Sequence, residues 1–122
     1  MNPSANKTMP VDIVEDEFRA EVINASQPVL VEFWAPWSRP CRILDATLAE
    51  LAEERPGAVK VVKVNADSHP DLSLWYDIQS VPTLLFFWEG EPRCRIIGTA
   101  TKEAILAKVR LYCGAASQTL AK

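Results

Sequence analysis

Ser38 and Cys41, separated by Arg39 and Pro40, are the residues of this 122-residue chain whose spacing comes closest to known chemistry. Two cysteines at this spacing exchange disulfides: one thiolate attacks a target disulfide, and the second thiol resolves the mixed disulfide that forms. Here the first position holds serine, whose hydroxyl is not ionised near neutral pH and takes no part in thiol–disulfide exchange. The spacing therefore predicts a redox loop, and the residue types predict that its activity is lost or impaired.

Glu32 is the second residue with potential chemistry. It lies in the run Val29-Leu30-Val31-Glu32-Phe33-Trp34, which is otherwise apolar and typical of a central strand covered on both faces. A buried carboxylate is costly and usually serves a purpose, so we expect an ionisable group just before the loop. A buried ion pair that only supports the structure is the alternative.

Other chemistries lack the residues that they need. A serine nucleophile needs a basic partner, and the only histidine, His69, falls in a different loop. Cys94 and Cys113 belong to no Cys-x-x-Cys pair, so we predict no metal site, and no sequence motif predicts a cofactor. The net charge is 13 − 16 = −3 without a basic tract, which argues against nucleic acid or an anionic membrane as a partner.

The cysteine content and the chain ends bear on compartment and domain organisation. Three cysteines, an odd number, argue against a secreted disulfide framework and favour a reducing compartment, by default the cytoplasm. No apolar run approaches the ~20 residues of a membrane span. We expect residues 1–9 to be a flexible lead without a signal peptide, residues 10–114 to form one domain, and residues 115–122 to be a tail. A monomer is expected.

Strand-like and helix-like periodicities alternate along the chain, which is the pattern of an α/β protein. We expect strands over 29–34, 59–64, 84–88 and 93–97, with the last two joined by a tight turn at Glu89-Gly90. We expect helices over about 15–24, 40–55, 70–76 and 101–113, with stop signals at Pro56-Gly57 and Gly114. The loop that holds Ser38 thus joins a buried strand to a long helix.

Four separated segments of the chain together resemble the thioredoxin family. They are V-E-F-W-A-P-W-S-R-P-C, V-K-V-N-A-D, V-P-T-L-L-F-F and the glycine of I-I-G-T, and the resemblance spans roughly residues 12–113 almost without gaps. It implies the thioredoxin fold, an α/β fold in which helices flank both faces of a central mixed β-sheet. It also implies protein-disulfide reduction in cell redox homeostasis, with a thioredoxin reductase as a partner.

The resemblance also implies roles for individual residues. Ser38 occupies the position of the attacking nucleophile, where the family has cysteine, and Cys41 corresponds to the resolving thiol. Glu32 corresponds to the proton relay behind the dithiol, and Lys63 in the neighbouring strand is expected to pair with it. We expect burial to make Cys41 a slowly reacting thiol, and a small packing residue without redox function is the alternative.

A substrate groove is implied as well, and it does not depend on the missing sulfur. Val81-Pro82-Thr83 resembles the family's cis-proline loop, which would present the backbone of Val81 to an extended segment of a protein substrate or partner. Trp37, Pro40 and Gly98 would complete this groove. Binding could therefore persist without catalysis.

Three functional hypotheses remain open at the level of the sequence. The first is a disulfide reductase impaired by Ser38, and the second is a non-catalytic binding or chaperone-like module that holds a partner polypeptide in the groove. The third is a monothiol exchanger that works through Cys41 alone. Ser38 is compatible both with natural degeneration and with a Cys→Ser change introduced to disable an enzyme.

Overall fold

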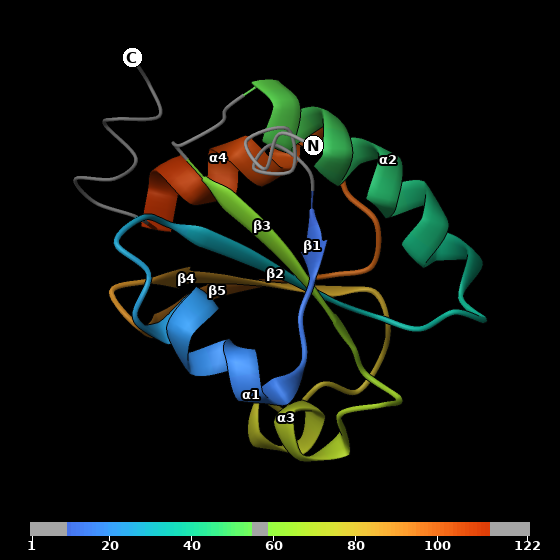
Figure 1. Cartoon of the computed structure of the whole chain (residues 1–122). Coiled ribbons are helices and arrows are strands. Elements are labelled where there is room, and N and C mark those ends of the chain that lie inside the picture. Colours follow the sequence, from blue (N-terminus) through green and yellow to red (C-terminus); the bar gives the residue numbers. More distant parts are fainter. Residues whose placement is uncertain (1–9, 55–58, 113–122) are drawn as a thin grey trace, which may run out of the picture.

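A five-stranded sheet with the order β1-β3-β2-β4-β5 forms the centre of the molecule (Figure 1). The computed structural model describes residues 10–54 and 59–112. The strands are β1 (Val11–Asp12), β2 (Val29–Trp34), β3 (Lys60–Asn65), β4 (Thr83–Trp88) and β5 (Glu91–Ile97). β1, β3 and β2 are parallel, whereas β4 is antiparallel to β2 and β5 is antiparallel to β4. The sheet is therefore mixed, as predicted.

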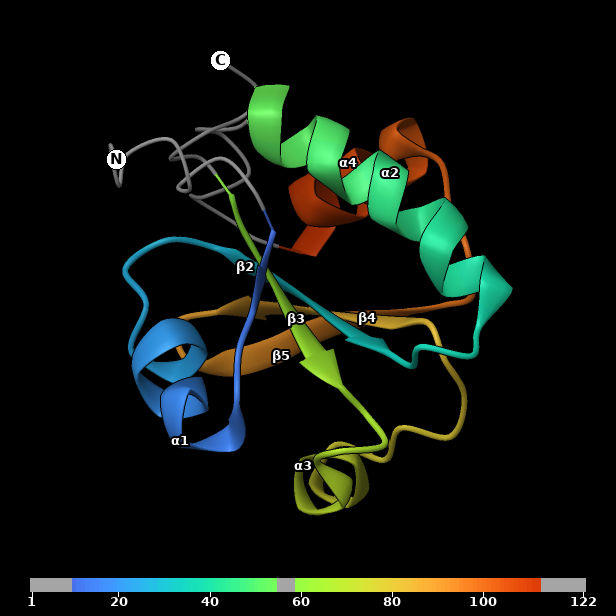
Figure 2. The same ribbon diagram turned by 45° about the vertical axis from the view of Figure 1, so that its right-hand side comes forward.

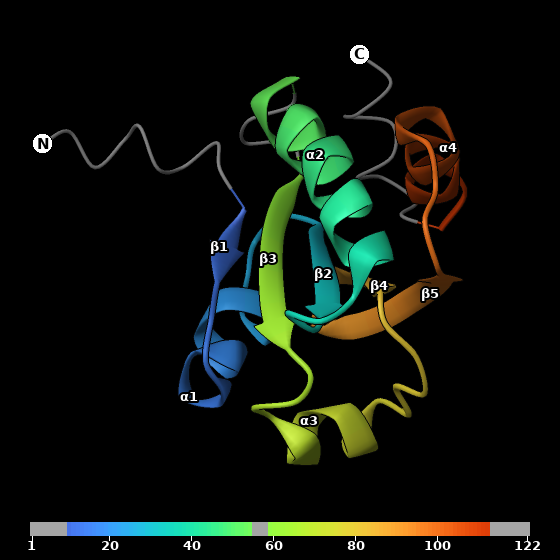
Figure 3. The same ribbon diagram turned by 90° about the vertical axis from the view of Figure 1, so that its right-hand side faces the viewer.

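Helices cover both faces of this sheet. α2 (Arg39–Glu54) and α4 (Lys102–Tyr112) lie on one face, and α1 (Glu15–Phe18) and α3 (Pro70–Trp75) lie on the other (Figures 1 and 3). The predicted α/β architecture, with helices on both faces of a mixed sheet, is confirmed. No helix within the described ranges is both long enough and apolar enough to cross a membrane.

β2 lies in the middle of the sheet, and its side chains alternate between the two faces. Leu30 packs into the core beneath α2 and α4. Val31 and Phe33 pack into the core on the α1 and α3 face. Glu32 is two residues from Leu30 and therefore points towards α2, which turns back over the sheet after leaving the end of β2 (Figure 2). The strand thus delivers one carboxyl group into an apolar core.

Aromatic rings fill the core on the α1 and α3 face. Phe87 meets Phe18 and Tyr76 edge to face, with ring centroids 5.7 and 5.4 Å away. Phe33 lies 6.5 Å from Tyr76. Edge-to-face pairs contribute about 0.5–1.5 kcal/mol each beyond the area that they bury. These contacts fix the α1 and α3 segments on the sheet.

The first helix differs from its prediction. Instead of one α-helix over 15–24, α1 continues as a π-helical turn, η2 (Arg19–Ile23), in which the amide of Asn24 donates to the carbonyl of Arg19 at 2.8 Å. This bond spans five residues, whereas an α-helical bond spans four. Phe18 and Val22 are both buried across the wider turn. Nothing in the local sequence explains it, because the apolar spacing here also suits an ordinary α-helix.

The other elements lie within two residues of their predicted bounds. β5 begins two residues early because Pro92, which lacks an N–H, is tolerated on an edge strand. The predicted lead 1–9, the helix stop at Pro56-Gly57, Cys113, Gly114 and the tail 115–122 lie outside the described residues.

Candidate functional site

Ser38 closes the N-terminal end of α2. Its Oγ accepts a hydrogen bond from the backbone N–H of Cys41 at 3.3 Å, and its own N–H donates to the carbonyl of Ala35 at 3.2 Å. The side chain is only 3% exposed. A hydroxyl that accepts from the N–H three residues later satisfies one of the unpaired donors at a helix start, and serine is among the residues preferred there. Ser38 is therefore a helix cap, a role that the sequence analysis missed although the residue type and position signalled it.

Cys41 lies in the first turn of α2 and is 2% exposed. The other cysteine within the described residues, Cys94, lies on β5, and burial raises the pKa of its thiol. Both cysteines are free. Since position 38 carries a hydroxyl, Cys41 has no thiol three residues earlier with which to form a disulfide.

Glu32 is fully buried, with none of its surface exposed. Removal from water is the main reason why the pKa of its carboxyl rises to about 9, and the hydrogen bond and negative charge of the neighbouring Asp45 raise it further. The positive charge of Lys63 acts in the opposite direction but is the weaker influence. Glu32 is therefore a neutral acid at pH 7.

Lys63 and Asp45 form the ion pair of this region. Lys63 lies directly opposite Glu32 in the β2–β3 register, but its Nζ bonds to Oδ2 of Asp45 on α2 at 3.1 Å. We expected Lys63 to pair with Glu32, whereas its ion pair in the structure is with Asp45. The physical reason is that a protonated Glu32 carries no charge, whereas the partly exposed carboxyl group of Asp45 lies within ion-pair distance of Lys63. Nζ also lies 4.8 Å from the centre of the Trp34 ring.

Glu32 and Asp45 together hold three buried oxygens, Oε1 and Oε2 of Glu32 and Oδ1 of Asp45, that receive no hydrogen bond from a donor in the described chain. Two ionised carboxylates have no hydrogen to share, so a bond between them forms only when one is protonated. A proton held by Glu32 and directed at Asp45 supplies the missing partner for both acids. The pair can therefore store one proton between β2 and α2.

The groove segments meet at one end of the sheet. Phe33 pairs with Thr83, and Thr83 pairs with Ile97, so the register aligns the end of β2, the start of β4 and the end of β5. The Val81–Pro82 peptide bond is cis, and the carbonyl of Pro82 accepts from the N–H of Gly98 at 2.9 Å. Val81 precedes this ladder and is not one of its paired residues. The register thus places the cis-proline loop and Gly98 at the end of the sheet where β2 leads into the loop of Ser38.

Two large apolar side chains, Trp37 and Ile97, are exposed at this end of the sheet. Trp37 is 68% exposed, and its indole N–H donates to Asp67 at 2.8 Å, which fixes the ring although it faces solvent. Ile97 is also exposed. Gly98 has a φ of 87°, and a Cβ at this position would meet no atom within 4 Å, so the backbone here stays accessible. Pro40 lies in the first turn of α2, beside the loop. Asp67 was missed by the sequence analysis, because nothing near residue 67 signals a partner 30 residues away.

A mixed sheet with a strand–loop–helix redox position and a cis-proline loop at the same edge defines a protein of the thioredoxin class. A family model described as Thioredoxin matches residues 9–111, and the chain belongs to the thioredoxin family. It is a member of a family of redox proteins.

Several curated proteins are similar to this chain. It is 41% identical over 100 residues to a thioredoxin of Pyropia yezoensis, which covers 82% of this chain and 94% of that protein. It is 39% identical over 93 residues to thioredoxin 1 of a Nostoc species, covering 76% and 87%. It is 43% identical over 103 residues to a chloroplastic M-type thioredoxin of Pisum sativum, covering 84% of this chain and 60% of the pea protein.

Proposed function

We propose that this chain is a thioredoxin-family disulfide oxidoreductase whose dithiol turnover is blocked at Ser38. The observation that carries the proposal is the hydrogen bond from the Cys41 amide to Ser38 Oγ, which makes the nucleophile position a helix cap. Cys41 is the single thiol of the loop and is buried, so it has neither access to a substrate disulfide nor a second sulfur to release one.

Cys41 and Glu32 could take part in disulfide reduction if position 38 carried a second thiol. A thiolate at position 38 would attack a substrate disulfide, form a mixed disulfide and release one substrate thiolate. Cys41 would then attack the sulfur at position 38, release the second substrate thiolate and complete an internal disulfide, with two electrons passing to the substrate. Glu32 is protonated at pH 7, so it would return a proton to the Cys41 sulfur when an external reductant opens that disulfide.

The test is Ser38→Cys in an insulin-reduction assay driven by dithiothreitol. We expect the variant to exceed the unmodified chain by about 100-fold or more, since the scaffold around the loop is intact. The matched control, Ser38→Cys with Cys41→Ser, should accumulate mixed disulfides without turnover. A Ser38→Cys variant that folds and stays inert would refute the proposal.

The exposed edge favours a second activity, in which the groove binds an extended polypeptide without turnover. Trp37, Ile97 and the backbone around Gly98 offer an apolar surface that does not involve sulfur. Calorimetry with carboxymethylated insulin B chain, which has no free thiol, tests this activity. We expect Cys41→Ser to leave its affinity unchanged and Trp37→Ala to reduce it by about fivefold. Equal affinities in all three proteins, or none in the unmodified chain, would rule the activity out.

We propose that the chain is a monomer, because the mechanism above uses residues of one chain. We also propose that it is cytoplasmic, because its odd number of cysteines favours a reducing compartment. Sedimentation of the reduced protein tests the first part. Imaging of the tagged chain tests the second, and a plastid location, as in the name of the pea relative, would correct it.

A further inference from the structure

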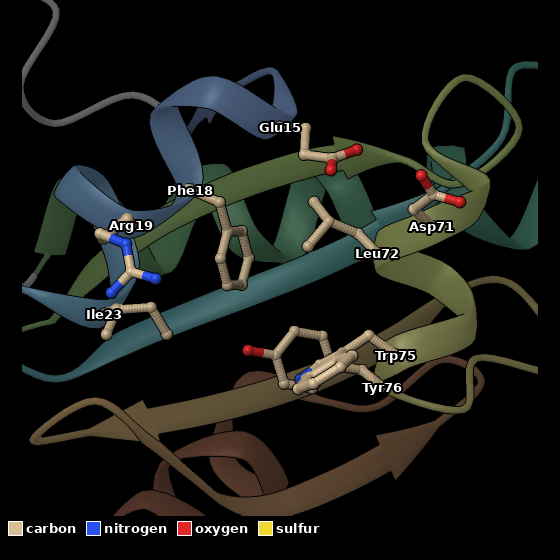
Figure 4. A pocket seen from close by; sticks show the side chains of 8 residues that line it. All are labelled: Glu15, Phe18, Arg19, Ile23, Asp71, Leu72, Trp75 and Tyr76. Carbon is tan, nitrogen blue, oxygen red and sulfur yellow. The ribbon is translucent and has the colours of Figure 1, made fainter.

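A pocket of about 420 Å³ opens on the face of the molecule covered by α1 and α3 (Figure 4). Its base consists mainly of Phe18 and Tyr76, whose ring centroids lie 5.6 Å apart. Both rings pack on Phe87 of the sheet. Because these rings hold one another in place, the base is formed before any ligand arrives.

Trp75 forms one wall of the pocket and is 80% exposed (Figure 4). Its neighbour Leu74 is 82% exposed but does not line the pocket. Trp75 lies four residues after Asp71, so the two side chains can line the pocket from one side of α3. The indole is therefore available to a ligand in the pocket, and Leu74 provides a matched surface residue outside it.

Charged groups of opposite sign mark the two ends of the pocket. Glu15 and Asp71 reach one end from different helices, and the Arg19 guanidinium lies at the other end, above Ile23 (Figure 4). None of the three charged groups forms an ion pair with another residue of the described chain. Across the pocket, the order is therefore two carboxylates, the apolar base and the guanidinium.

We propose that this pocket docks a segment of a partner protein that presents a basic, an apolar and an acidic side chain in that order on one face. The basic group would lie between Glu15 and Asp71 and beside the Trp75 ring, which attracts cations. The apolar side chain would cover Phe18 and Tyr76. The acidic group would pair with Arg19, and its opposite sign fixes the direction of the segment.

The openness of the site favours a protein segment as the occupant. All three charged residues are exposed, so they mark the rim of a surface depression and do not enclose a small molecule. An extended segment places every second side chain on one face, so the sequence Arg-Gly-Phe-Gly-Glu presents all three groups together.

The test is a titration of the ¹⁵N-labelled full-length chain with the capped peptide Arg-Gly-Phe-Gly-Glu, followed by NMR. We expect saturable shifts confined to amides of α1, η2 and α3. Trp75→Ala and the pair Glu15→Gln with Asp71→Asn should each weaken binding by about fivefold. Leu74→Ala is the matched control and should leave the affinity unchanged, as should Cys41→Ser.

Peptide controls separate specific docking from general adhesion. Glu-Gly-Phe-Gly-Glu lacks the basic group and Arg-Gly-Ser-Gly-Glu lacks the apolar one, and both should bind about fivefold more weakly. The proposal is overturned by the absence of saturable shifts at about 5 mM peptide. Equal effects of Leu74→Ala and Trp75→Ala would also overturn it. Shifts confined to the loop around Trp37 would assign binding to the groove instead, without bearing on the blocked turnover.

Discussion

The two faces of the sheet are packed with similar apolar residues, but among the described residues only the face beneath α2 encloses a buried carboxyl group. There Glu32 lies beside Asp45, which pairs with Lys63 and follows Cys41 by about one turn of α2. On the other face the same strand contributes Val31 and Phe33 to a core of aromatic rings, and charged groups stay at the rim. Because side chains alternate along β2, the strand places apolar side chains on the aromatic face and the ionisable Glu32 on the face beneath α2.

The comparison shows that the face beneath α2 retains a residue that costs stability. A fully buried acid is tolerated only by holding its proton, and that requirement makes folding dependent on pH. The titratable side chain packed in the aromatic core is Tyr76, and burial raises the pKa of its hydroxyl from an ordinary value of 10, so it adds no pH dependence near neutrality. We infer that Glu32 is kept for proton chemistry beside the thiol position.

The largest expected effect comes from truncating a ring on the aromatic face. Phe87→Ala removes edge-to-face contacts with Phe18 and Tyr76 and leaves a cavity, so unfolding in urea should become easier by about 3–5 kcal/mol. Its matched control is Phe86→Ala, since Phe86 is equally buried on the other face. We expect Phe86→Ala, but not Phe87→Ala, to speed alkylation of Cys41 in the folded protein. Equal acceleration would show that the two faces are not independent.

The next effect is a gain in stability from neutralising the buried acid. The pKa of Glu32 is higher in the folded chain than in the unfolded one, so the folded state binds the extra proton between about pH 4.5 and 9. Stability of the unmodified chain should therefore fall as the pH rises through this range. Glu32→Gln should be more stable by about 3 kcal/mol at pH 7, with a flatter pH dependence in urea unfolding.

Glu53→Gln on the exposed side of α2 is the control for this measurement, and it should leave the pH dependence unchanged. If Glu32→Gln and the unmodified chain respond alike to pH, Glu32 is ionised at neutral pH and the proposed proton donor is lost.

Asp45→Asn should change the pKa of Glu32 although Glu32 itself is not substituted. Removing the Asp45 charge and its hydrogen bond should lower the pKa of Glu32, because both raise it in the unmodified chain. An NMR titration of the Glu32 carboxyl carbon measures this change directly. An unaltered midpoint would mean that the two acids do not share a proton.

The smallest effect concerns the helix cap. Ser38→Ala removes the oxygen that accepts from the Cys41 amide, and we expect a loss of about 1 kcal/mol in the free energy of unfolding. Ser38→Asp keeps an acceptor and adds a negative charge at the start of α2, so it should retain most of that stability. Similar losses in both variants would indicate that the bond at Ser38 does not stabilise the helix.

Most of the fold was predictable because its signals are local and periodic. The apolar run 29–34, the alternation at the hairpin and the cap of α4 at Thr101, whose Oγ1 accepts from Ala104 at 3.1 Å, are all visible in the sequence. The π-helical turn was not, since its extra residue changes the hydrogen bonds without changing the apolar spacing.

The sequence predicted which residues form the site, but it did not predict which side chains contact each other. Ser38, Cys41, Glu32 and Lys63 were expected together, and their elements place them in one region. Asp45 was missed because an acidic residue on a long helix resembles an ordinary solvated position, and its contact with β3 depends on how α2 crosses the sheet. Pairings that depend on tertiary packing leave no trace in residue spacing.

Steady-state insulin reduction by the unmodified chain, compared with Cys41→Ser at the same concentration and dithiothreitol level, tests the blocked loop most directly. The account predicts that both proteins match the rate with dithiothreitol alone. Turnover by the unmodified chain that Cys41→Ser abolishes would contradict it, because one thiol beside a capping hydroxyl would then be sufficient for catalysis.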